Sequence, residues 1–79
     1  MVQTLQIVLF TIDDVKRFVT LTNKYHFPIN LSNGKYKIDA KSIMGIFSLD
    51  LSKPINLNIH AEGSLLESIL KVVEAYVID

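Results

Sequence analysis

Residues 28–49 read PINLSNGKYKIDAKSIMGIFSL, and this stretch decides the fold. Its first half holds two short runs, PINLS and KYKIDA, on either side of Asn33-Gly34, a dipeptide suited to the positive φ angles of a tight hairpin turn. Ser42 then opens a short apolar turn, SIMGIFSL, whose glycine argues against a long helix. We therefore predict an antiparallel hairpin followed by one or two helical turns.

The clearest single strand follows, where residues 55–61 read INLNIHA. Ile55, Leu57 and Ile59 alternate with polar side chains, which gives the strand one core face and one wet face. A final helix is predicted after Gly63 ends this strand, because Ser64 and Glu67 have the spacing of a capping box. Its apolar stripe contains Leu65, Leu66, Ile69, Leu70, Val72, Val73 and Tyr76.

The N-terminal part predicts a strand and then a helix. Residues 2–9 place apolar side chains among Gln and Thr, as in a half-buried strand that ends at Phe10. Thr11 can cap the helix that follows, and Asp14 stands at the capping-box spacing from it. The helix must end before Pro28. The residues that recur at helical spacing are Ile12, Val15, Phe18, Val19 and Thr22.

The predicted order is strand, helix, strand, strand, short helix, strand, helix. This order predicts one domain, residues 1–79, of the α+β class, in which a four-stranded sheet is covered on one face by the helices. Such an architecture is an open-faced βαββαβα sandwich. Its other face should be polar.

Composition excludes several classes of function. The chain has no cysteine and no metal-ligand spacing, so we expect no disulfide, metal or cofactor. Eight basic residues balance eight acidic ones without a basic excess or stripe, which argues against nucleic acid as a partner and leaves little barrier to a homodimer. The apolar start is too short to span a membrane and has no basic flank, so we expect a cytoplasmic protein. The sequence contains neither a Gly-rich phosphate loop nor a nucleophile-base pair, so we do not expect an enzyme.

The string KSIMGIFSL at residues 41–49 closely resembles the segment around the regulatory serine of HPr, the small phosphocarrier of the bacterial sugar phosphotransferase system. The predicted element order is also that of HPr. The resemblance covers nearly the whole chain and implies that the sheet is antiparallel throughout. It also implies protein partners: an HPr kinase, a transcriptional regulator or other components of the phosphotransferase system.

The resemblance fails where HPr carries its phosphoryl group. The family has a Gly-x-His-x-Arg-Pro pattern at the start of its first helix, and counting back from Lys24 places Thr11 at the histidine, with Asp13 and Asp14 at the arginine and proline. A threonine lacks the basic nitrogen of a phosphohistidine carrier. At about 4 Å each carboxylate would oppose a phosphate by roughly 1 kcal/mol in water. We interpret Thr11 as a helix cap and predict no catalytic residue.

Ser42 falls on the serine that a dedicated kinase phosphorylates in many HPr proteins. The alternative is an ordinary N-cap, because serine is preferred at that position. In HPr the residues that match Ile43, Met44 and Phe47 form an exposed apolar patch that docks partners, whereas their spacing alone favours core packing. We call Ser42, Ile43, Met44 and Phe47 together the Ser42 face.

Three functions follow from these observations. The first is a regulatory or protein-interaction module without phosphohistidine carrier activity, comparable to the HPr paralogue Crh, which acts through the Ser42 face. The second is a phosphocarrier whose acceptor has moved to another residue, His26 or His60, although neither aligns with the active-site loop and both are better explained as structural histidines. The third is a structural or oligomeric module that keeps the fold and has lost the pathway.

Overall fold

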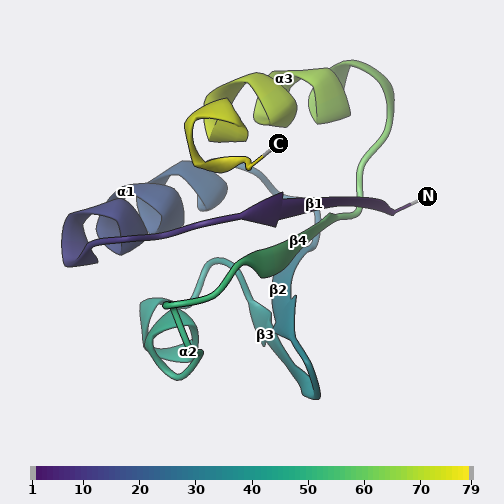
Figure 1. Ribbon diagram of the computed structural model, residues 1–79. Helices are drawn as coiled ribbons and strands as arrows, with labels where there is room; N and C mark the ends of the chain where they lie inside the picture. The colour runs from purple at the N-terminus through teal and green to yellow at the C-terminus, as the bar shows by residue number, and fades with distance from the viewer. Residues whose placement is uncertain (1, 79) are drawn as a thin grey trace.

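The computed structural model describes residues 2–78 and has the predicted order of elements (Figure 1). A short 3₁₀ turn, η1, is added after the last helix. The elements are β1 (Gln3–Ile7), α1 (Ile12–Thr22), β2 (Ile29–Asn33), β3 (Tyr36–Asp39), α2 (Ile43–Phe47), β4 (Ile55–Ile59), α3 (Gly63–Val73) and η1 (Glu74–Tyr76).

The four strands form one antiparallel sheet in the order β1-β4-β2-β3. Leu57 of β4 lies opposite Leu5 of β1 and Leu31 of β2, and Leu31 in turn lies opposite Ile38 of β3. A row of four apolar side chains therefore crosses the sheet on the side that the helices cover. The α+β open-faced sandwich predicted from the sequence is confirmed.

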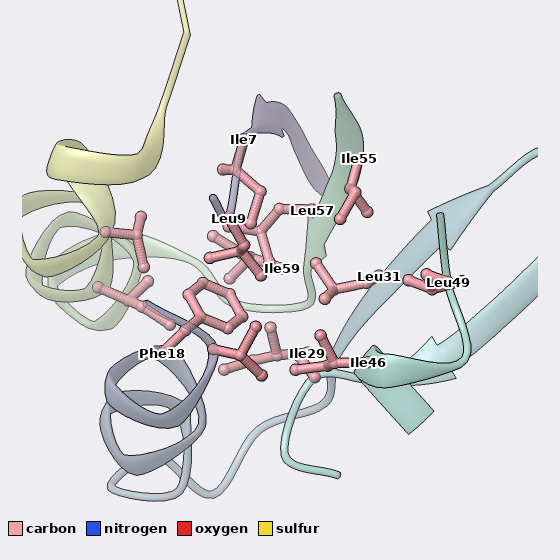
Figure 2. Packing of buried hydrophobic residues seen from close by; sticks show 14 residues of the cluster. Ile7, Leu9, Phe18, Ile29, Leu31, Ile46, Leu49, Ile55, Leu57 and Ile59 are labelled. Carbon is pink, nitrogen blue, oxygen red and sulfur yellow. The ribbon is translucent and has the colours of Figure 1, made fainter. Parts of the chain in front are cut away.

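The core lies between this sheet and the helices. The predicted alternation in β4 is confirmed, because Ile55, Leu57 and Ile59 are all fully buried. Figure 2 shows these side chains in one cluster with Phe18 of α1 and Ile46 of α2. Ile69 and Val73 of α3 complete the same buried cluster. None of the helices in the part of the chain that the structure describes combines the length and apolar character needed to cross a membrane.

The opposite side of the sheet is polar, and its side chains bond to one another across three strands. The Asn58 amide nitrogen donates to the Asn30 side-chain oxygen at 3.2 Å and to the Ser32 hydroxyl at 3.1 Å. Asn58 in turn accepts a hydrogen bond of 3.0 Å from the Thr4 hydroxyl. These polar side chains hydrogen-bond to one another, so this side of the sheet does not need a layer of helices over it.

The hairpin turn lies one residue later than the sequence predicts. Asn33 is the last residue of β2 and pairs with Tyr36, so the two-residue turn is Gly34-Lys35. Of these two turn residues Gly34 alone has a positive φ angle, 63°, which matches a type II′ turn with glycine at its first central position. The asparagine therefore serves as a strand residue.

The sequence also misplaced both ends of α3. The helix begins at Gly63, so Ser64 lies inside the first turn and does not cap it. It ends at Val73, before Tyr76, which belongs to η1. Three residues assigned to apolar stripes are largely exposed: Ile12, Leu65 and Val72. Helical spacing alone overestimates the buried stripe, because an 11-residue helix can bury only part of its circumference against one sheet.

After η1 the chain returns to the outer edge of β1. Val77 forms an isolated bridge with Ile7, and the amide of Ile78 donates to the Gln6 carbonyl at 3.0 Å. The Tyr76 ring meets the buried Phe18 ring edge-on, with the centroids 5.6 Å apart. The end of the chain thus covers part of a sheet edge and closes the core over α1.

Phe18→Ala is expected to lower the free energy of unfolding by about 3–5 kcal/mol, because it leaves a cavity between α1 and the sheet and removes the Tyr76 contact. Urea denaturation measures the loss. Phe10→Ala is the matched control: its ring is 80 % exposed, and the expected change is within about 0.5 kcal/mol. Equal losses in the two variants would contradict this assignment of the core.

Candidate functional site

The start of α1 is closed by its own side chains. The Thr11 hydroxyl accepts a hydrogen bond of 3.0 Å from the Asp14 amide. In return, Asp14 Oδ2 accepts the amides of Phe10 at 3.0 Å and Thr11 at 3.2 Å. This is the capping box that the sequence predicts, with one further amide added. A carboxylate oxygen therefore occupies the donors nearest the beginning of the helix.

This arrangement determines what chemistry the helix end can support. The amides at a helix N-terminus are the groups that would hold a phosphate. Here the amides of Phe10 and Thr11, which immediately precede the first helical residue Ile12, bind the Asp14 carboxylate and bring its negative charge to this helix end. Asp13, exposed on the same turn, adds a second negative charge. Thr11 is exposed, but its hydroxyl is engaged by the Asp14 amide. The end of α1 is a finished helix cap.

The two histidines lie outside this helix end. His26 is exposed in the segment between α1 and β2. His60 is partly buried and directly follows β4, where its amide donates to the Pro28 carbonyl at 3.0 Å. Within residues 2–78 no group of three or more His, Cys, Asp or Glu side chains is placed to hold a metal ion.

Ser42 is the N-cap of α2 and is exposed. Its hydroxyl accepts the Gly45 amide at 3.1 Å, and its own amide donates to the Asp39 carbonyl at 3.1 Å. The N-cap interpretation of Ser42 is thus a structural fact, and it leaves the hydroxyl on the protein surface. A serine can serve as a cap and still be accessible to a modifying enzyme.

Gly45 explains how α2 comes to lie so close to β3. A Cβ atom at this position would stand 3.4 Å from two atoms of the Ile38 side chain and 3.3 Å from the Ser42 hydroxyl. An alanine here would therefore be a tight fit that requires small shifts of the Ser42 and Ile38 side chains, and a longer side chain would have little room on this side. The glycine that argued against a long helix therefore also permits the close approach of α2 to Ile38 of β3.

The apolar residues of α2 divide between the core and the surface. Ile46 is fully buried, and Ile43 is partly buried against the core. Met44 and Phe47 are 78 % and 43 % exposed. Ile43 packs against the core, whereas Met44 and Phe47 are exposed, so a docking patch formed by Ile43, Met44 and Phe47 stays a prediction.

A basic stripe on α1 was missed by the analysis of net charge. Lys16, Arg17 and Lys24 line a shallow groove with Thr20 and Leu21, with a volume of about 320 Å³. Lys16 and Thr20 are four residues apart and share one face of α1, and Lys24 lies in the turn directly after the helix. Their spacing is readable in the sequence, but a balanced total charge conceals it.

The comparisons with known proteins identify the family. Residues 14–79 match the family described as the PTS HPr component phosphorylation site. The chain belongs to the HPr family. The match contains Ser42 and all of α2, whereas Thr11 lies before its first residue.

Solved structures agree with this assignment. The chain is similar to the crystal structure of the phosphocarrier protein HPr from Bacillus anthracis str. Ames, with 29 % identity, a TM-score of 0.69, and coverage of 99 % of this chain and 96 % of that one. It is also similar to HPr-C-His from Thermoanaerobacter tengcongensis, with 29 % identity, a TM-score of 0.68, and coverage of 95 % and 88 %. No curated protein matches the sequence.

Thr11→Ala and Asp14→Ala should each lower the free energy of unfolding by about 1 kcal/mol, because each breaks the reciprocal bonds of the cap. Thermal or urea denaturation measures the change. Asp13→Ala is the matched control: this residue takes no part in the capping box, so it should cost only about 0.3 kcal/mol through the helix dipole. If Asp13→Ala cost as much as Asp14→Ala, general electrostatics would account for the effect.

Proposed function

We propose that this HPr-family protein is a regulatory or protein-interaction module without phosphohistidine carrier activity, consisting of one domain over residues 1–79 and acting through the Ser42 face. The observation that carries the proposal is the pair of hydrogen bonds from the Phe10 and Thr11 amides to Asp14. A carrier must receive and release phosphate at this helix end, and here those bonds fix the Asp14 carboxylate at the end, next to the second negative charge of Asp13.

The chemistry of Thr11 supports the same conclusion. A phosphohistidine forms when an imidazole nitrogen attacks the phosphoryl group, and a neighbouring cation stabilises the charge. Thr11 offers a hydroxyl without a basic nitrogen, and the two residues that follow Ile12 are acidic. Neither His26 nor His60 lies at this helix end, so neither is favoured as a displaced acceptor.

The Ser42 face supports the second part of the proposal, the role in protein interaction. Ser42 is exposed, and Met44 and Phe47, which lie within the next five positions, present large apolar surfaces to solvent. Methionine and aromatic side chains are favoured at protein interfaces, because methionine adapts its shape and aromatic rings bury much area. The partners we propose are an HPr kinase, a transcriptional regulator or components of the phosphotransferase system in a bacterial cytoplasm.

Incubation with phosphoenolpyruvate and Enzyme I is expected to leave the protein without an acid-labile phosphate, because no imidazole stands at the start of α1. Intact-protein mass spectrometry at neutral pH measures the mass, and a phosphocarrier HPr treated in parallel is the control. A mass gain of one phosphate that disappears in acid would overturn the loss of carrier activity. Loss of that gain in a His26→Gln or a His60→Gln variant would identify the displaced acceptor.

An HPr kinase supplied with nucleotide should phosphorylate Ser42, since its hydroxyl is exposed at the start of α2. Mass spectrometry locates the phosphate. Ser42→Ala should abolish the modification, whereas Ser48→Ala, at the other end of α2, should leave it unchanged. If the kinase modifies an HPr of known competence but leaves this protein untouched, regulation through Ser42 is wrong.

A further inference from the structure

A groove distinct from the Ser42 face lies between the tip of the β2–β3 hairpin and the loop that follows α2, two segments that can be followed in Figure 1. Its volume is about 380 Å³, within the range of small-molecule sites. The hairpin contributes Asn33, Lys35 and Tyr36 to its wall. The far side contributes Ser48, Asp50 and Lys53, and Leu49, largely buried, also lines it.

The charges in this groove are unequal. Lys35 and Lys53 reach it from different segments, and both side chains are exposed. Within residues 2–78 the Lys35 ammonium has neither a hydrogen bond nor an ion pair. Two cations thus face one carboxylate, that of Asp50.

Asp50 is already committed to its own loop. One of its oxygens, Oδ1, accepts the Ser52 amide at 3.0 Å and also the Ser52 hydroxyl. These bonds, with a smaller contribution from the charge of Lys53, hold the pKa of Asp50 below its ordinary value of 3.8. The carboxylate is therefore ionised at neutral pH, and the groove keeps a net charge of one positive unit when its two lysines are counted.

We propose that this groove binds a small phosphate monoester, with the ammonium groups of Lys35 and Lys53 on either side of the phosphate. A doubly charged phosphate matches two cations, and the Asn33 amide and the Tyr36 hydroxyl supply further donors. The Ser48 hydroxyl donates to the Gly45 carbonyl, so toward a ligand it acts as an acceptor.

Tyr36 favours a particular organic group on the phosphate ester. Its side chain is 72 % exposed at the rim of the groove, although large apolar side chains usually bury more of their area. A flat ring presented in this way gives a ring-bearing ester a surface on which to stack. The groove should therefore prefer phenyl phosphate to inorganic phosphate.

Nuclear magnetic resonance titration of the full chain with inorganic phosphate and with phenyl phosphate tests the proposal. The amide signals of Gly34, Ser48 and Asp50 should shift and saturate, with a Kd for phenyl phosphate on the order of 1 mM because both lysines are exposed. Phenyl phosphate should bind about fivefold more tightly than inorganic phosphate, and Tyr36→Ala should remove that preference.

Two variant pairs decide the outcome. Lys35→Gln with Lys53→Gln should weaken binding about tenfold, whereas Lys16→Gln with Lys71→Gln, which remove the same charge outside the groove, should leave it within about twofold. The proposal is overturned if sodium chloride at matched ionic strength produces the same shifts, if the shifts centre on residues 42–45, or if both pairs weaken binding equally.

Discussion

Burial of one side of β4 is the constraint on which the rest of the structure depends. This strand lies between β1 and β2, and its three alternating apolar residues are fully buried. Each neighbouring strand must therefore place its own apolar residues opposite them, and the helices must cover the same side. The other side of the sheet is then free to be polar, where Asn58 links the side chains of three strands.

The fold could be predicted from the sequence because its signals are local and repeated. The alternation in residues 55–59 and the capping box at Thr11 each specify an element without knowledge of its neighbours. The predictions from sequence were wrong where contacts between elements determine the position of a turn or the exposure of a side chain. Asn33 became a strand residue because pairing with Tyr36 extends the ladder, and Leu65 is exposed because α3 turns only part of its surface to the sheet.

The candidate site was predictable in residue identity but not in geometry. The sequence placed Thr11, Asp14 and Ser42 at helix starts, and all three make the hydrogen bonds expected of caps. It could not show that Asp14 also takes the Phe10 amide, since that bond depends on the path of the chain before the helix. The groove beside Lys35 and Lys53 was likewise invisible, because its two walls meet only in the folded chain.

The internal carboxylate of α1 also bears on how this protein could change over evolutionary time. A single substitution of Thr11 by histidine would still leave the Asp14 carboxylate at this helix end, where its charge opposes a phosphate, while removing the hydroxyl that caps the helix. Histidine-based phosphate transfer at this helix end would thus need coordinated changes at neighbouring positions, and the change at Thr11 alone would destabilise the helix start. The stability that the cap gives to α1 therefore opposes the gain of a histidine at this position.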